Sequence, residues 1–340
     1  MTRFLLSTLL LMVTFGAVGI TSAATAEQMI MKCDNGEARS CFTLGLMYAD
    51  GVGVTQDDFK AAKFYRNACD GKIVGGCVLL GWMYHQGTGV TQDDFKAVEL
   101  FQKACDGQDA AGCSSLGRSY EDGTGVRQDD SKAIELYQKA CDGQDAVGCF
   151  NLGNRYYTGG GVTRDKTKAG AFYRKACEGK AARGCSNLGR MYYNGDGIIQ
   201  DKSKTVELYR QACNGQDMGS CDSLGTMYYN GDAVEQDYFK AVEFYQKACN
   251  GQHAWGCFNL GVMYDDGTGV TQDVFKATEL YLKACNGKAA KSCSNLGVMY
   301  EQGVGVRQSN DEALKYYGKA CDLKDKAGCK NYAELKTGKR

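Results

Sequence analysis

The sequence predicts an all-α protein, a right-handed α/α solenoid of antiparallel helix pairs. The 18 cysteines form nine Cys-x7-Cys pairs, and each pair begins 36 residues after the previous one. Each 36-residue repeat holds two amphipathic segments separated by a glycine-rich turn, and the chain contains no proline. A fixed period of this length is typical of repeat proteins whose neighbouring units stack and share one core.

Residues 1–24 are typical of a secretory signal peptide. Arg3 supplies a positive charge, residues 4–20 are almost entirely apolar, and small residues then offer cleavage after Ala24 or after Ala26. A membrane anchor is the alternative, but the apolar stretch is short for a spanning helix. We therefore expect a secreted or periplasmic mature chain without a membrane span.

Eight full repeats are expected over residues 39–326. A partial unit over residues 27–38 is expected to form an N-terminal cap helix. Residues 327–340 are expected to form a C-terminal cap helix followed by a basic tail. Atypical end units of this kind close the core of a solenoid.

The first helix of a repeat is expected to begin near the second cysteine of a pair and to end at the turn, as in residues 113–122. Its predicted buried stripe is Leu116, Gly117 and Tyr120. The Leu-Gly pair recurs in all eight repeats. Because glycine inside a helix costs roughly 1 kcal/mol relative to alanine, we expect another backbone to pack closely against it.

The turn has the pattern Gly-x-Gly-Val, as in residues 87–90. Its first glycine suits the left-handed residue that ends a helix, and an aspartate such as Asp93 is expected to cap the next helix. That second helix ends at Gly107. Repeat six departs from the pattern at Ala233, where a second turn glycine is expected. The apolar face of the second helix has four residues at helical spacing: Ala97, Leu100, Phe101 and Ala104.

Two disulfide schemes are sterically plausible. Pairing across repeats gives eight bonds and strands Cys33 and Cys329, whereas local pairing gives nine bonds and leaves no free thiol. Local pairing is therefore preferred, and metal binding is disfavoured by the x7 gap and by the presence of only two histidines. The expected disulfides are Cys33–Cys41, Cys69–Cys77, Cys105–Cys113, Cys141–Cys149, Cys177–Cys185, Cys213–Cys221, Cys249–Cys257, Cys285–Cys293 and Cys321–Cys329.

The charge balance argues against nucleic acid as a partner. The chain has 40 basic and 40 acidic side chains, whereas a nucleic-acid binder is expected to show a basic excess. Disulfides in this number are typical of proteins that fold in an oxidising compartment. We expect a monomer without a cofactor.

One repeat shows the full pattern: Leu260-Gly261, Met263-Tyr264, Gly267, Gly269-Val270, Asp273, Lys276-Ala277, Tyr281 and Lys283-Ala284-Cys285. This pattern resembles the Sel-one-like repeat, a relative of the tetratricopeptide repeat. With Cys-x7-Cys in every repeat, the chain is similar to the Helicobacter cysteine-rich proteins. The resemblance implies a secreted or periplasmic protein that contacts a host, and it implies penicillin binding or weak β-lactamase activity, with β-lactams or peptidoglycan-related peptides as ligands.

No catalytic residues for β-lactam hydrolysis are identified in the sequence. Serine enzymes of that kind use Ser-x-x-Lys and Ser-Asp-Asn, and neither occurs in this chain. Lys336-Thr337-Gly338 spells the third motif, but alone and near the C-terminus. Catalytic residues therefore remain unassigned, and enzymatic activity is implied by the resemblance only.

Positions two, five and nine after the second cysteine share one face of the first helix and vary from repeat to repeat; in repeat six they are Ser223, Thr226 and Asn230. We call these positions the variable face. In tetratricopeptide-like solenoids this helix lines the concave surface. The predicted groove residues are Leu79, Trp82, Arg118, Asn151, Asn154, Asn187, Arg190, Asn194, Asn259 and Asn295.

The residue types on this face can contact a ligand in different ways. Asparagine amides can hold a peptide backbone because they both donate and accept, arginines can bind a carboxylate, and Trp82 with Leu79 can form an apolar anchor. The alternative is that the asparagines bond neighbouring helices or face water. Three functions stay open: binding of a peptide or protein ligand, which is preferred, a weak β-lactamase, or a periplasmic structural scaffold.

Overall fold

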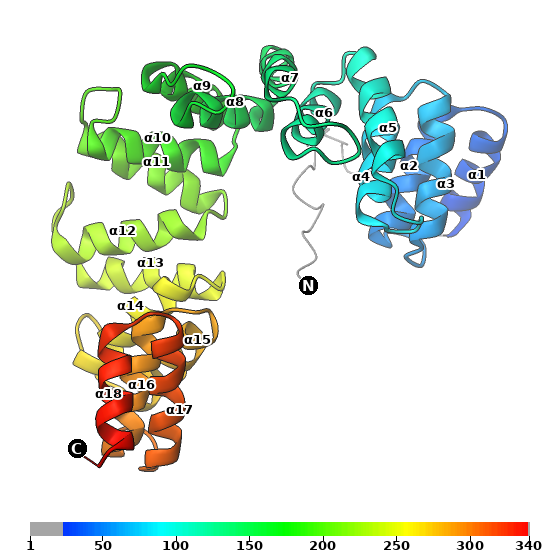
Figure 1. Cartoon of the computed structure of the whole chain (residues 1–340). Coiled ribbons are helices and arrows are strands. Elements are labelled where there is room, and N and C mark those ends of the chain that lie inside the picture. Colours follow the sequence, from blue (N-terminus) through cyan, green and yellow to red (C-terminus); the bar gives the residue numbers. More distant parts are fainter. Residues whose placement is uncertain (1–22, 339–340) are drawn as a thin grey trace. The chain divides into compact units, whose positions relative to one another are not determined.

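The structure is a computed structural model that describes residues 23–338, so the predicted signal peptide lies almost wholly outside the described residues. Over that range every regular element is a helix, and the all-α prediction is confirmed (Figure 1). The chain divides after Gly143 into two compact units, each of which is described by itself. The first unit holds α1 to α7 and the second holds α8 to α18.

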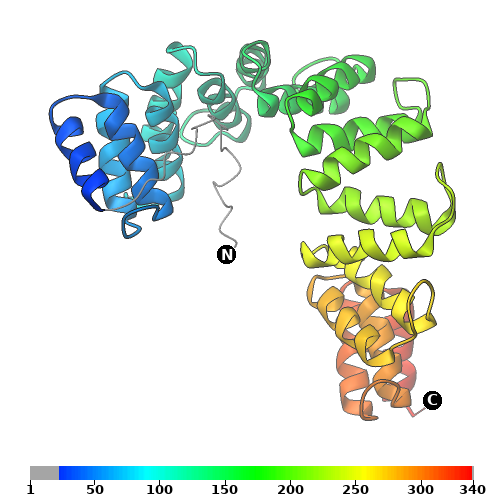
Figure 2. The ribbon, with the colours of Figure 1, turned by 180° about the vertical axis from the view of Figure 1, so that it is seen from behind.

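Each repeat consists of a helix A and a helix B, which pack against each other, as Figure 2 shows from behind. The A helices are α2 (Ala38–Asp50), α4 (Val74–Gln86), α6 (Ala110–Asp122), α8 (Ala146–Thr158), α10 (Ala182–Asn194), α12 (Met218–Asn230), α14 (Ala254–Asp266) and α16 (Ala290–Gln302). The B helices are α3 (Asp58–Asp70), α5 (Asp94–Asp106), α7 (Asp130–Asp142), α9 (Lys166–Glu178), α11 (Lys202–Asn214), α13 (Tyr238–Asn250), α15 (Val274–Asn286) and α17 (Asn310–Asp322).

The two end helices differ slightly from their expected bounds. The N-terminal helix α1 covers Ala23–Asp34 rather than residues 27–38, because a turn with Gly36 at φ +90° separates it from α2. At the other end α18 covers Lys326–Lys336. Both pack on the adjacent repeat of their own unit.

Side-chain caps occur at the start of every helix B and of four of the eight A helices. Helix A starts three residues before the second cysteine. In α6 the Asp109 carboxylate caps it by accepting a hydrogen bond from the Gly112 amide at 3.0 Å, whereas α2, α4, α10 and α16 begin at the same place without a side-chain cap. Helix B starts where the sequence predicts, with Asp93 accepting from the Lys96 amide at 3.1 Å. Gly87 ends α4 in the left-handed conformation at φ +69°, as predicted.

Gly107, which follows α5, is not in the left-handed conformation that Gly87 adopts after α4. Its φ is −75°, and the left-handed residue is Gln108 at φ +65°. A Cβ atom at position 107 would lie 2.4 Å from Cγ1 of Val74 on α4. Glycine is therefore required at this position by the close approach of the preceding helix A.

The second turn glycine combines a left-handed backbone with close packing. Gly89 has φ +65°, and a Cβ there would lie 2.2 Å from the carbonyl oxygen of Asp58. Repeat six keeps the same conformation without glycine, since Ala233 has φ +64°. An alanine in the left-handed region raises the free energy of the folded state by on the order of 1 kcal/mol. Ala233 is therefore a site of local backbone strain.

The buried stripe of helix A differs from the prediction in one column. Leu116 and Gly117 are buried, but Tyr120 is half-buried at the edge, where its hydroxyl accepts a hydrogen bond from Lys132 at 2.7 Å. The third buried column lies three residues after the leucine. In six repeats it is a methionine: Met47, Met83, Met191, Met227, Met263 and Met299.

An aromatic ring of helix B packs against the helix-A glycine in every repeat. The expected close backbone contact is present at two of these glycines, where an added Cβ would lie 3.3 Å (Gly117) or 3.4 Å (Gly153) from a helix-B carbonyl oxygen. In every repeat, however, the ring is the nearer neighbour and fills the space that a side chain would need. In α12, a Cβ at Gly225 would lie 2.6 Å from Cδ1 of Tyr245. The eight pairs are Gly45–Tyr65, Gly81–Phe101, Gly117–Tyr137, Gly153–Tyr173, Gly189–Tyr209, Gly225–Tyr245, Gly261–Tyr281 and Gly297–Tyr317.

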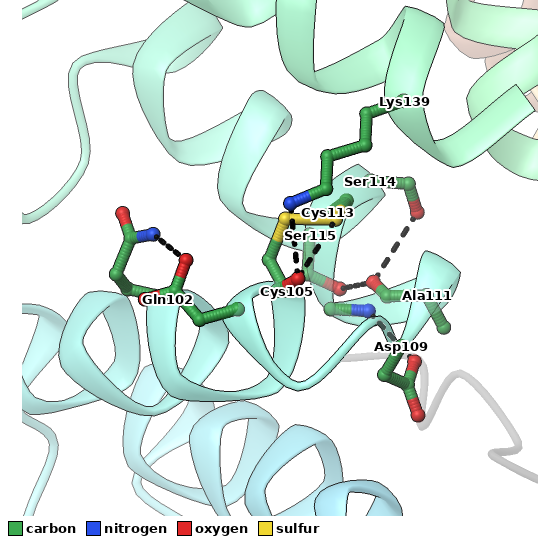
Figure 3. Close-up of a disulfide and its surroundings, with 10 residues drawn as sticks. Gln102, Cys105, Asp109, Ala111, Cys113, Ser114, Ser115 and Lys139 are labelled. Atoms are coloured by element: carbon green, nitrogen blue, oxygen red, sulfur yellow. Dashed lines mark hydrogen bonds between the residues drawn. A yellow bond between two sulfur atoms is a disulfide. The ribbon is translucent and has the colours of Figure 1, made fainter. Parts of the chain in front are cut away.

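Local disulfides join the end of each helix B to the start of the next helix A. The Cys105–Cys113 bond joins α5 to α6 with its two Cα atoms 4.5 Å apart (Figure 3). Lys139 of α7 donates to the carbonyl oxygen of Cys105 at 3.1 Å, so the next helix B contacts the same junction. Seven further bonds have the same eight-residue separation. Cys141 and Cys149 are also disulfide-bonded, and no cysteine of the described chain is free.

Two glycines of α12 test the ring-on-glycine contact. We expect Gly225→Ala to lower the stability of the protein by about 1–3 kcal/mol, because the new methyl group overlaps the Tyr245 ring. Gly219→Ala is the matched control: the nearest atom to its new Cβ would be Nε2 of His253 at 3.9 Å. It should raise stability by up to about 1 kcal/mol through helix propensity. Thermal unfolding of the oxidised protein measures both, and equal effects of the two substitutions would contradict the packing argument.

Candidate functional site

In the first unit the variable face carries one aromatic and one basic side chain in contact. Trp82 of α4 packs its ring 5.3 Å from that of Phe101, and the guanidinium carbon of Arg118 on α6 lies 5.9 Å from the Trp82 ring. Arg118 is exposed and also pairs with Asp122 at 3.4 Å. Leu79 is half-buried against the core of the N-terminal repeats. Trp82 and Arg118 thus show that the fifth positions of neighbouring repeats meet.

In the second unit the predicted asparagines bond one another and the core. The Asn187 amide donates to the Asn154 side-chain oxygen at 3.3 Å, and the Tyr173 hydroxyl donates to the same oxygen at 2.7 Å. Arg190 donates to the Asn187 oxygen at 3.3 Å and lies over the Tyr157 ring. These asparagines therefore join α8 to α10.

The remaining asparagines divide between internal and exposed positions. Asn259 of α14 donates to the Asp222 carboxylate of α12 at 2.8 Å, and Asn295 hydrogen-bonds the Tyr281 side chain. Asn151 is half-buried and Asn194 is exposed. For Asn187 and Asn259 the structure favours the alternative that asparagines bond neighbouring helices. A role in ligand binding stays a prediction for the variable face.

A cavity of about 220 Å³ opens on the variable face of repeat six. It lies among α10, α11, α12 and the turn that follows α12. Thr226 and Asn230 are exposed, while Ser223 is half-buried. The lining residues are Tyr193, Tyr209, Asp222, Ser223, Thr226, Met227, Asn230 and Asp232.

Asp222 is the unusual residue of this cavity. The same position is a phenylalanine in repeats one, four and seven, where the ring packs against the helix-B tyrosine, as Phe150 does against Tyr173 with ring centroids 6.1 Å apart. Burial raises the pKa of Asp222, and the Asn259 hydrogen bond and the charge of His253 oppose that rise. The scaffold does not require a carboxylate where other repeats place a ring.

The second carboxylate of the cavity is fully engaged. Lys202 pairs with Asp232 at 2.7 Å, and the Tyr193 hydroxyl donates to its other oxygen at 2.7 Å. Hydrogen bonds from Lys202 and Tyr193 lower the pKa of Asp232. Asp232 is therefore a paired carboxylate, whereas Asp222 has no ion-pair partner anywhere in residues 23–338.

Tyr209 presents an unused hydroxyl to the cavity. In five other repeats the equivalent tyrosine donates to a side chain of its own helix A: Glu121, Asn154, Thr226, Asp265 or Glu301. In repeat five the two helix-A positions that supply these partners are Arg190 and Tyr193. Arg190 donates to Asn187 and Tyr193 donates to Asp232, so neither bonds Tyr209. Within the described range the Tyr209 hydroxyl has no hydrogen-bond partner, and burial raises its pKa.

The predicted groove residues do not line this cavity. Three residues of the variable face, Ser223, Thr226 and Asn230, line it, whereas sequence reasoning did not name Asp222, Tyr193, Tyr209 and Asp232. One signal was available: the position after the second cysteine is phenylalanine, valine or serine in the other full repeats and aspartate only in repeat six.

No cluster of three or more histidine, cysteine, aspartate or glutamate side chains within residues 23–338 is placed to hold a metal ion. The helices of this range are each too short or too polar to cross a membrane.

The fold and the disulfides define the class: a helical repeat solenoid whose junctions are closed by disulfides. The family model of the Sel1 repeat matches most of the chain, and this protein therefore belongs to the Sel1 repeat family. The matched segments are residues 38–72, 75–109, 110–145, 146–180, 182–217, 220–253, 256–288 and 290–325.

Comparison with solved structures finds similar proteins. The Sel1-like repeat protein c5321, a protective antigen present in uropathogenic Escherichia coli strains, is 28% identical with a TM-score of 0.73; the match covers 91% of this chain and 67% of that one. A Sel1 repeat protein from Oxalobacter formigenes is 23% identical with a TM-score of 0.68, covering 93% and 92%. Helicobacter pylori cysteine rich protein B is 33% identical with a TM-score of 0.34, covering 41% and 99%. No curated protein matches with significance.

The substitution Asp222→Asn tests the electrostatics of the cavity. Because folding raises the pKa of this carboxyl, the folded state binds the proton more tightly and the ionised form lowers stability once the pH exceeds that pKa. We expect Asp222→Asn, which keeps an oxygen for Asn259, to raise the melting temperature at pH 7.5. The gain should vanish at pH 3, where the wild-type carboxyl is protonated in both states. A lower melting temperature at pH 7.5 would contradict this account.

Proposed function

We propose that the protein binds a peptide or protein partner through the variable face of its second unit, in the periplasm or outside the cell. The observation that carries the proposal is the polar cavity on α12. It is lined by a carboxylate without an ion pair, Asp222, and by Tyr209, whose hydroxyl lacks the partner that five other repeats supply. Sel1 repeats are scaffolds for protein–protein interaction, and the family assignment supports this use of the face.

The disulfides support the proposed compartment. Bonds at each repeat junction persist in oxidising surroundings and are rare in the cytosol. A similar Escherichia coli protein is described as a protective antigen, which supports contact with a host for a solenoid of this type. Membership in the Helicobacter cysteine-rich group is part of this proposal, based on the Cys-x7-Cys pattern.

The cavity offers little for β-lactam hydrolysis. Its one serine, Ser223, is followed three residues later by Thr226 and not by a lysine, and no lysine lines the cavity. The Ser223 hydroxyl donates to the carbonyl oxygen of Gly219 at 2.9 Å. Binding is therefore proposed as the function.

The test is selection of a random linear peptide library displayed on phage by the purified, oxidised protein. Enriched peptides are synthesised, and their dissociation constants are measured by calorimetry. Arg190→Ala combined with Asn194→Ala should weaken binding by about tenfold or more, because both side chains are exposed on the variable face and can contact a ligand without being part of the core. Asn154 is left intact because it holds the Tyr173 hydroxyl.

The control is a second double variant, which replaces one arginine and one asparagine by alanine on the B helices. Arg174→Ala combined with Asn214→Ala alters exposed positions of α9 and α11 and should leave the dissociation constant unchanged. Failure of the wild type to enrich any peptide would overturn the proposal, and so would equal weakening by the two double variants.

A further inference from the structure

We propose that the cavity among α10, α11 and α12 receives one basic side chain, a lysine or arginine, of the bound peptide, with Asp222 as its counter-ion. This inference rests on the proposed function and names the chemistry of the ligand residue at one subsite. It is carried by the charge of the cavity, its hydrogen-bonding groups and its size.

The charge argument starts from the two carboxylates. Asp232 is neutralised by Lys202 at 2.7 Å. Asp222 accepts a hydrogen bond from the neutral amide of Asn259 at 2.8 Å, and His253, whose charge also acts on it, is too far away to form an ion pair. A half-buried carboxylate without an ion pair lowers stability unless a cation approaches it. Arg190 does not supply that cation, because it bonds Asn187 and lies over the Tyr157 ring. A basic ligand side chain would complete the pair.

The hydrogen-bonding groups fit the same occupant. A lysine ammonium carries three donors and an arginine guanidinium five, and neither accepts. Asp222, Tyr209 and Asn230 line the cavity, and a carboxylate, a hydroxyl without a hydrogen-bond partner and an amide oxygen can each accept a hydrogen bond. An acidic ligand side chain would instead face two carboxylates.

Size and lining suit a single long side chain. Drug-sized ligands occupy pockets of roughly 300–1,000 Å³, and this cavity measures about 220 Å³. Met227 and the rings of Tyr193 and Tyr209 provide apolar surface for the methylene stem of a lysine or arginine, and tyrosine rings attract cations.

The position is specific to repeat six. Repeats one, four and seven fill the equivalent position with Phe42, Phe150 and Phe258, each of which packs on a tyrosine of its own repeat. In repeat six the ring is replaced by a carboxylate that the scaffold does not need for packing. A sequence change of this kind points to ligand chemistry.

The experiment uses peptides enriched by the wild-type protein in the selection described above. Each lysine or arginine is replaced in turn by norleucine, which keeps the apolar stem and removes the charge. At one position this change should weaken binding to the wild type by about tenfold or more. Against Asp222→Asn the same change should have little effect, because the counter-ion is absent.

Glu243→Gln serves as the control protein. It removes one negative charge from an exposed position of α13, outside the cavity, and should keep the full sensitivity to norleucine. Thermal unfolding confirms that each variant is folded. Equal sensitivity of the wild type and Asp222→Asn at every basic position would overturn the inference while leaving peptide binding intact, and so would enriched peptides without basic residues. A protein that enriches no peptide would overturn the proposed function itself.

Discussion

The contact between a helix-B tyrosine and a helix-A glycine is the constraint on which the repeats depend. The glycine lets the ring lie directly on helix A, so the two helices of a repeat approach closely. The same tyrosine also extends its hydroxyl to a polar side chain of helix A, such as Asn154 or Thr226. One residue thus joins the core of a repeat to its surface. The Tyr209 hydroxyl has no such partner within the described residues, and Tyr209 lines the cavity of repeat six.

The disulfides act at the other end of the helix pair. Each joins the last turn of helix B to the first turn of the next helix A, as at Cys105–Cys113. In the chain-entropy model a loop of about nine residues contributes about 2.5 kcal/mol per bond. The glycine at the end of helix B, exemplified by Gly107, keeps this junction tight because a side chain would overlap the preceding helix A. Within each unit, the variable face is consequently presented by a backbone that these disulfides constrain.

The sequence predicts most of the fold because its local signals agree with the tertiary structure. Asp93 caps α5 and Gly87 ends α4 as expected, and the count of thiols selects the local disulfides. The sequence does not distinguish a ring from a backbone as the partner of the helix glycine, since both require the absence of a side chain. The cavity was missed for a related reason: Asp222 and Asn259 are 37 positions apart and meet only when repeats stack.

Repeat six departs from the scaffold pattern at Asp222, where we propose that it holds a ligand side chain. A crystal structure of the protein with a selected peptide is the sharpest test of this proposal. We expect an ammonium or guanidinium nitrogen within hydrogen-bonding distance of both the Asp222 carboxylate and the Tyr209 hydroxyl. A peptide bound along the B helices, with no ligand atom in the cavity among α10, α11 and α12, would contradict it.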